Sequence, residues 1–473
     1  MSSNDQHRRF GISRRHLLGG AAGLLGSTAL ALLAQRAARG ETHFAPRARR
    51  VVYLFMSGAP GQLETFDYKP DLVRLAGTEL PESVRGGQRL TTMSSGQSSF
   101  PIVAPRVGFR QYGQSGAWVS DLLPNIGGIA DRICIVRSMQ TSEINHDPAT
   151  TMMQTGHFLP GRPSFGSWVS YALGDLTRNL PEFLVLLSSS RVPLGQPLTS
   201  RYWGSGFLPS PHQGVQLQGG AEPVLYLDDG AGLSAARRDR LRDLRASLDG
   251  LHHARTRDPN IEHRARTFEL AGRMQLSVPA AVAVASEPPS TFALYGDDAR
   301  VPGSFAWNCV MARRMLENDV RFVQLYHRDW DHHSNLPSNH AVVAQDVDRA
   351  SAALVQDLAQ RGLLDDTLVI WGGEFGRTVY SQGVPAHGEY GRDHHPRCFS
   401  VWMAGGGIQA GLVHGTTDDF SYNVLEGPVH VHDFHATLLH LLGFDHTRLT
   451  YRAEGRDFRL TDVAGSVVSS LLA

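Results

Sequence analysis

The densest group of metal-binding side chains follows the apolar run 321–326. It reads HRDWDHHSN over residues 327–335 and places Asp331, His332 and His333 side by side. Imidazoles and carboxylates are ligands for divalent transition metals. The alternative is a polar loop that caps the following helix. Loops at strand ends carry sites in α/β proteins, so we predict that Asp331 and His333 bind a metal.

A second group of candidate ligands flanks residues 371–395. Glu374 stands on a glycine turn, GGEFGRT, directly after the apolar run 367–371. His394 and His395 belong to the segment GRDHHP, which leads into the apolar run 400–404. We expect Glu374, His394 and His395 to join the same metal site.

Two arginines accompany these ligands. Arg377 lies on the glycine turn and Arg392 lies just before the histidine pair. A guanidinium can bind phosphate or sulfate through paired hydrogen bonds, and an ordinary surface ion pair is the alternative for each. We predict that Arg377 and Arg392 act in catalysis by holding an anionic substrate.

Two loops earlier in the chain carry further candidates. Glu64 lies in a segment rich in small residues that follows the run 51–56, and it is a candidate ligand. Asn145 and His146 follow the run 133–136. His146 could act as a ligand, a nucleophile or a base, and Asn145 could contact the substrate. Taken alone, each of these loops is more often a solvated turn.

The proposed ligand set contains histidine and carboxylate side chains without thiolates. Such a set fits zinc, manganese or iron better than a calcium site lined only by oxygen. We expect a divalent metal, with zinc first and manganese, iron or calcium as alternatives.

The elements that must position these residues alternate along the chain. Apolar runs predict buried strands, and between them lie helical patterns at 307–317, 339–361 and 433–442. This alternation predicts an α/β fold with a mostly parallel central sheet and helices on both faces. Ligands then bind beyond the carboxyl ends of the strands. The predicted strands are 51–56, 133–136, 183–187, 321–326, 367–371 and 400–404.

Composition argues against several classes of partner. The chain has 473 residues, with 45 basic and 45 acidic side chains and a formal net charge of zero. This balance gives no electrostatic case for nucleic acid or an anionic membrane surface. Cys134, Cys309 and Cys398 form no C-x-x-C motif and are expected to be buried. A small anionic ester is the expected partner.

The amino terminus has the pattern of an export signal. Arg14 and Arg15 follow Ser13, and an uncharged apolar stretch extends over residues 17–34. This pattern resembles a twin-arginine signal, with an uncleaved membrane anchor as the alternative. We expect residues 1–45 to be the signal segment and residues 46–473 to be one domain with a helical excursion around 235–275. The expected location is periplasmic or secreted.

The order of these segments resembles the alkaline phosphatase and sulfatase superfamily. More closely, it resembles a branch of twin-arginine-exported, sulfatase-like proteins named as domain of unknown function fifteen-oh-one. The pieces that carry the resemblance are TFDxKP from Thr65, WDxH from Trp330, GEFGRT from Gly373, GRDH from Gly391 and GGGI from Gly405. The resemblance implies an alkaline phosphatase-like fold and metal ligands at Asp331, His333, Glu374 and a late histidine, His394 or His395.

Two positions depart from the superfamily pattern. His146 stands nine residues before Thr155, where the resemblance implies a Ser, Thr or Cys nucleophile. Phe375 stands where it implies a histidine. A site without a hydroxyl or thiol cannot run the usual covalent step. We therefore expect an exported, metal-dependent hydrolase of phosphate or sulfate esters, or alternatively an inactive binding or scaffold protein that keeps the fold.

Overall fold

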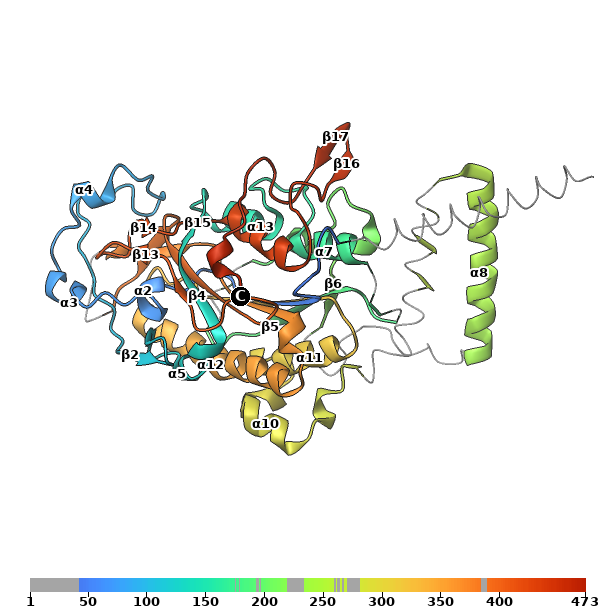
Figure 1. The fold of residues 1–473 in the computed structure, drawn as a ribbon, viewed down its shortest axis with the longest axis horizontal. Helices are drawn as coiled ribbons and strands as arrows, with labels where there is room; N and C mark the ends of the chain where they lie inside the picture. Colours follow the sequence, from blue (N-terminus) through green and yellow to red (C-terminus); the bar gives the residue numbers. More distant parts are fainter. Residues whose placement is uncertain are drawn as a thin grey trace, which may run out of the picture.

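A nine-stranded sheet forms the centre of the computed structural model (Figure 1). The structure describes residues 42–473 except 175, 178, 193–194, 196, 219–233, 259–260, 262–263, 266–267, 270–280 and 384–388. The strand order is β12-β4-β11-β8-β1-β7-β5-β6, and β15 also pairs with β4. The strands are β1 (Arg50–Met56), β4 (Ile133–Gln140), β5 (Phe183–Ser188), β6 (Val215–Leu217), β7 (Phe322–His327), β8 (Thr367–Gly372), β11 (Phe399–Ala404), β12 (Val413–His414) and β15 (Val429–His430). All six predicted strands are confirmed.

The direction of the strands decides which residues can meet. β11 pairs antiparallel with β4 and with β8, whereas every other neighbouring pair in this sheet is parallel. Every strand except β11 therefore runs the same way, and the predicted mixed α/β fold with a mostly parallel sheet is confirmed. The carboxyl ends of the other strands and the amino end of β11 share one border, which we call the site edge.

Helices cover both faces of the sheet because the strands alternate their apolar side chains. Val52, Leu54 and Met56 of β1 belong to one core, whereas Val51, Tyr53 and Phe55 belong to the other. The first core includes residues of α10 (Pro289–Tyr295), α11 (Phe305–Glu317) and α12 (Leu336–Gln360). The second includes residues of α6 (His146–Thr155), α7 (Phe165–Leu173) and α13 (Val431–Leu441). The three predicted helices correspond to α11, α12 and α13.

Shorter elements close the site edge. Residues 74–118 contain α4 (Glu82–Arg85) and most of the hairpin of β2 (Phe109–Tyr112) and β3 (Ala117–Ser120). β9 (Gly376–Ser381) and β10 (Arg392–His395) form a separate antiparallel pair just before β11. Val379 and Tyr380 of β9 belong to a third, smaller core that also includes Leu63 and Tyr422.

Two predicted segments fall partly or wholly outside the described residues. The expected export signal lies almost entirely in residues 1–41, which the structure does not describe. The helical excursion begins with α8 (Ala235–Thr256), and much of its remainder is not described. Within the described part of the chain, none of the helices has the length and apolar character needed to cross a bilayer.

Candidate metal centre

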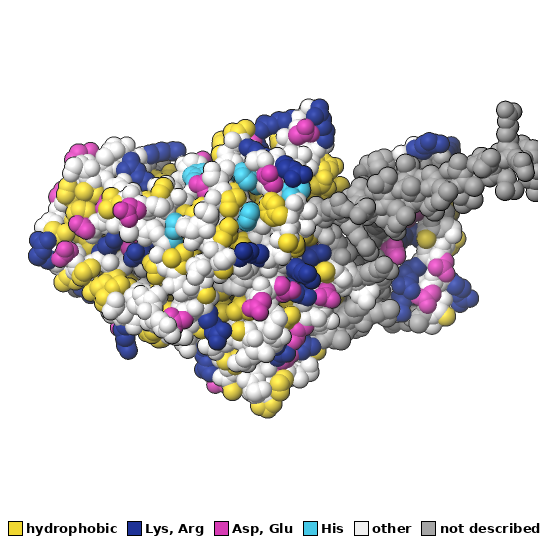
Figure 2. Space-filling view, in the orientation of Figure 1, with side chains coloured by type: hydrophobic (Ala, Val, Ile, Leu, Met, Phe, Trp, Pro, Cys, Tyr) yellow, Lys and Arg dark blue, Asp and Glu magenta, His cyan; other side chains and the backbone are white. Residues whose placement is uncertain are grey.

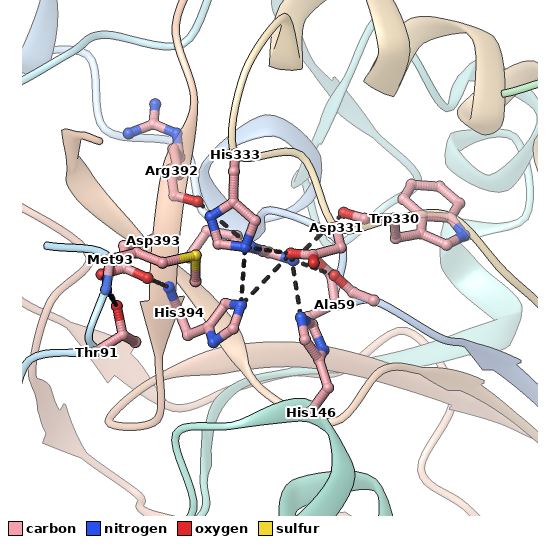
Figure 3. Close-up of polar contacts among 12 residues, drawn as sticks. Ala59, Thr91, Met93, His146, Trp330, Asp331, His333, Arg392, Asp393 and His394 are labelled. Atoms are coloured by element: carbon pink, nitrogen blue, oxygen red, sulfur yellow. Dashed lines mark hydrogen bonds and ion pairs between the residues drawn. The ribbon is translucent and has the colours of Figure 1, made fainter. Parts of the chain in front are cut away.

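Four side chains from three separate stretches converge at the site edge (Figure 3). His146 is the first residue of α6, which follows β4; Asp331 and His333 lie in the loop after β7. His394 lies on β10, just before β11. One ligand atom from each of the four lies within 4.8 Å of the others. His394 reaches this group because β11 is reversed, which brings the residues that precede it to the same border as the residues that follow the other strands.

The three imidazoles point at one carboxylate oxygen. Oδ1 of Asp331 lies 2.8 Å from Nε2 of His333, 3.1 Å from Nε2 of His146 and 3.4 Å from Nε2 of His394. Nε2 of His333 is also 3.1 Å from Nε2 of His394. Three ring nitrogens and one oxygen therefore face a common point.

The opposite nitrogen of each ring is held by an oxygen. Nδ1 of His146 is 2.6 Å from Oε1 of Glu374, and Nδ1 of His394 is 2.7 Å from the carbonyl oxygen of Ile144. Nδ1 of His333 contacts Oε1 of Gln382. A carbonyl or carboxylate oxygen only accepts, so each Nδ1 donates its hydrogen. In a neutral ring Nε2 then presents a lone pair to the centre, whereas in a protonated ring Nε2 donates to Oδ1 of Asp331. Two lone pairs that face each other repel unless a cation or a proton lies between them.

The ionisation of the group suits metal binding. Burial would raise the pKa of Asp331, but the charge of Arg377 and hydrogen bonds from the three histidines hold it well below its usual range. Burial lowers the pKa of His394 to about 4, so that ring is neutral at pH 7. Burial acts in the same direction on His146, but its hydrogen bonds to Asp331 and Glu374 prevail and raise its pKa.

Arg377 is buried behind Asp331 rather than exposed to an incoming anion. Its guanidinium donates to Oδ1 of Asp331 at 2.7 Å, to the carbonyl oxygen of Ala59 at 3.1 Å and to that of Gly58. Only 1% of the residue is exposed. These contacts fix the orientation of the Asp331 carboxylate.

Arg392 and Glu64 form a second buried pair away from the four ligands. Nε of Arg392 is 2.8 Å from Oε1 of Glu64, and its other nitrogens donate to the carbonyl oxygens of Val103, Thr378 and Val379, each at 2.9 Å. Both residues are almost fully buried. The structure therefore brings neither the predicted anion-binding arginine nor the predicted ligand Glu64 into the centre.

The other predicted residues occupy different positions. Glu374 holds His146 and is not one of the four converging residues. His395 lies next to His394 on β10, but its Nε2 contacts the carbonyl oxygen of Tyr422 at 2.6 Å. Asn145 is exposed beside His146. Phe375 packs on the centre, with its ring centroid 4.8 Å from that of His146 and 4.6 Å from that of His394.

Gly58 is a positioning residue that the sequence did not single out. Its φ is +104°, and a Cβ there would lie 2.7 Å from the backbone nitrogen of Asp331. Its own N–H donates to Oε1 of Glu374 at 3.0 Å, and its carbonyl oxygen accepts from Arg377. Gly58 follows β1 by two residues and contacts the loops that carry the candidate ligands. In the sequence, the only sign of this role is that Gly58 lies among small residues just after a predicted strand.

The fold and the site together define a class: an α/β protein with a candidate metal centre of three histidines and one aspartate at the carboxyl end of a mostly parallel sheet. Residues 48–472 match the family described as "Protein of unknown function (DUF1501)". The chain belongs to this family. No curated protein matches it.

Solved structures that match the chain do so at low identity. The lipoteichoic acid synthase LtaP from Listeria monocytogenes is 9% identical, with 90% of this chain and 79% of that chain covered and a TM-score of 0.34. The PsFucS1 sulfatase from Pseudoalteromonas sp. is 14% identical, with 87% and 70% covered and a TM-score of 0.34. A mutant of TAB5 alkaline phosphatase is 10% identical, with 76% and 92% covered and a TM-score of 0.28.

The close approach at Gly58 predicts an effect of Gly58→Ala on both stability and the site. Gly77 is the matched control, because its φ is +81° but nothing lies within 4 Å of an added Cβ. Gly77→Ala should cost about 1–2 kcal/mol of unfolding free energy from the left-handed backbone alone. Gly58→Ala should cost more, because the Asp331 backbone must also move. Urea unfolding of both variants measures the difference; equal losses would contradict the close approach.

Proposed function

We propose that this protein is an exported, metal-dependent hydrolase of phosphate or sulfate esters. The observation that supports this most directly is the convergence of three imidazole nitrogens on one ionised carboxylate oxygen. A divalent cation at that point would bind the three nitrogens and the oxygen, and so remove the repulsion between the nitrogens. The resemblance of the sequence motifs to alkaline phosphatases and sulfatases supports the choice of ester.

The donor set fits zinc best, with manganese or iron as alternatives. Three nitrogens and one oxygen would supply four donors, and an ester oxygen would have to bind the metal as a fifth ligand. Each histidine has the second hydrogen bond typical of metal ligands. Side chains of Asp331, His146 and His333 keep 18%, 19% and 22% of their area exposed. A substrate could therefore approach from solvent on the side of these three residues.

Each residue then has a defined task. His146, Asp331, His333 and His394 would hold the metal, which would polarise the ester and stabilise charge on the leaving oxygen. Glu374 would orient His146, and Arg377 would keep Asp331 ionised and in place. This geometry favours a ligand role for His146 over the nucleophile role considered from the sequence. Asn145, exposed beside His146, is placed to contact the substrate.

Export is proposed from the sequence of residues 1–45. Its arginine pair and apolar stretch support twin-arginine export and a periplasmic or secreted location. The described cysteines, Cys134, Cys309 and Cys398, are free and buried. The described part of the fold thus stands without a disulfide, as suits a chain that folds before export.

One observation favours the second candidate, an inactive binding protein that keeps the fold. The ring of Phe375 packs at a tilt against His146 and His394, at a position where the superfamily resemblance implies a further histidine. An apolar ring at that point removes a donor that could hold a second metal. A single-metal centre could still bind an anion without turning it over.

Metal content tests the centre directly. Elemental analysis of the purified chain after incubation with zinc and desalting should give about one metal per chain, following the donor count. Asp331→Asn combined with His333→Ala should abolish retention, because half of the donor atoms are lost. His252→Ala, which alters an exposed histidine on α8, is the control and should retain the metal. Full occupancy in the double variant would contradict the assignment.

Metal affinity should fall as pH is lowered. The raised pKa of His146 means that this ring carries a proton at a higher pH than a free histidine, and the metal must displace it. Apparent affinity should therefore fall by about tenfold per pH unit below that pKa. Competition with a chromogenic chelator measures the slope. In His146→Gln the affinity should be lower and the slope shallower; an unchanged slope would argue against His146 as a ligand.

Ester turnover separates the enzyme from the binding protein. The zinc- or manganese-loaded chain should hydrolyse an aryl phosphate or an aryl sulfate ester, and a chelator should reduce the rate at least about 100-fold. Arg377→Met should lower the rate and also the metal affinity, because it acts through Asp331. A chain that holds stoichiometric metal but hydrolyses neither ester would support the binding protein instead.

A further inference from the structure

A row of leucines is exposed on α8, the long helix that stands apart from the sheet and its covering helices (Figure 1). Leu241, Leu244, Leu248 and Leu251 are 50%, 57%, 57% and 70% exposed. Their spacing of three, four and three residues places them along one side of the helix. We call this side the leucine face. Four exposed leucines in a row are unusual on a soluble surface and indicate a contact with something apolar.

Basic side chains of α8 flank the leucine face. At about 100° per residue, Arg237 and Arg255 fall in line with the leucines at either end, and Arg240 and His252 fall beside them. The aspartates of α8, at 239, 243 and 249, fall on the far side together with Arg242, which pairs with Asp239. Figure 2 shows basic side chains exposed on this helix at the right-hand end of the molecule. The leucine face therefore has positively charged side chains at its ends and along its sides.

Another side of α8 contacts residues that follow the helix in the chain. Arg245 lies over the ring of Phe268, 3.7 Å from its centroid, and Arg264 pairs with Asp249 at 2.8 Å. Ile261 is buried. The described residues Arg264 and Phe268 thus contact the side of the helix that carries Arg245 and Asp249, and the leucine face lies away from these contacts.

The charges beside the leucine face favour an anionic surface over a second copy of the chain as its binding partner. The same leucine spacing could form a two-stranded coiled coil with a second copy, in which the residues flanking the seam face their counterparts. In a parallel pair, Arg240 of one copy would then face Arg245 of the other, and like charges would oppose pairing. An anionic surface instead satisfies the arginines while the leucines enter the boundary between headgroups and acyl chains.

We propose that the leucine face of α8 docks this protein on an anionic lipid surface. The helix would lie in the plane of the interface, with its leucines buried and Asp239 and Asp243 on the side away from the lipid. The net charge of zero is a sum over the whole chain and does not reveal the local positive charge of α8. A lipid surface interacts mainly with the charges of the face that lies against it. The contact would act independently of the metal centre.

A labelled cysteine on α8 reports the contact directly. The described native cysteines are buried, so an introduced surface thiol can be labelled selectively with an environment-sensitive fluorophore. In the full chain, Leu251→Cys places the label on the leucine face and Ala246→Cys places it on the opposite side. Vesicles of equimolar phosphatidylglycerol and phosphatidylcholine should shift the emission of the first label to the blue and leave the second unchanged. Equal responses of the two labels, or none, would overturn the proposal.

Co-sedimentation with the same vesicles measures the energetics. Replacing Leu241, Leu244, Leu248 and Leu251 by Gln should reduce binding of the full chain, and Arg237→Gln with Arg240→Gln should weaken it by about tenfold or more. Ala246→Gln with Ala254→Gln is the matched control and should bind as the parent does. Binding unchanged by the leucine and arginine variants would assign it to residues outside α8. A dimer in sedimentation equilibrium that the leucine variant dissolves, without lipid binding, would assign the face to a second copy.

Discussion

Three imidazole nitrogens and one carboxylate oxygen meet at the site edge, and the surrounding residues hold these four atoms close together. Without a shared cation, nitrogens 3.1 Å apart at His333 and His394 oppose each other. The fold maintains the arrangement with a contact behind each of three side chains: Glu374 behind His146, Gln382 behind His333 and Arg377 behind Asp331. These contacts are partly buried, and they leave the candidate ligands little freedom to turn away. Such preorganisation lowers the cost of gathering the donors when a cation binds.

The buried arginines show how electrostatics and packing are coupled at this centre. Arg377 and Arg392 satisfy their donors with backbone carbonyl oxygens as well as carboxylates. A fully buried guanidinium with that many partners stabilises the loops that carry the ligands and is costly to disturb. The positive charge of Arg377 also keeps Asp331 ionised, which makes its carboxylate a better ligand. Arg377 and Arg392, predicted from the sequence to hold an anion, thus have their donors engaged within the protein.

Sequence periodicity predicted the strands well because buried strands need continuous apolar runs, which local composition reveals. It located Asp331, His333 and His394 because polar residues directly beside such runs must lie at a sheet border. It could not predict the direction of β11, since an apolar run reads the same in either direction, and only that direction brings His394 to His146. Nor could it tell which of His394 and His395 joins the group of four, because the pleat of β10 decides which ring faces the centre. The roles of Gly58 and Gln382 depend on approaches between distant loops, which no local pattern records.

The position of β11 also governs how the chain can assemble. In the sheet, β4 touches the strands that begin with β8 only through β11, which lies between them. A ribosome emits β4 more than two hundred residues before β11 (Ile133 against Phe399), so the nascent sheet stays in two pieces with unpaired borders. Long-range pairing of this kind is slow and leaves edges open to aggregation. The candidate metal centre takes His394 from the residues just before β11, so its four side chains can meet only after the chain has been synthesised past that strand.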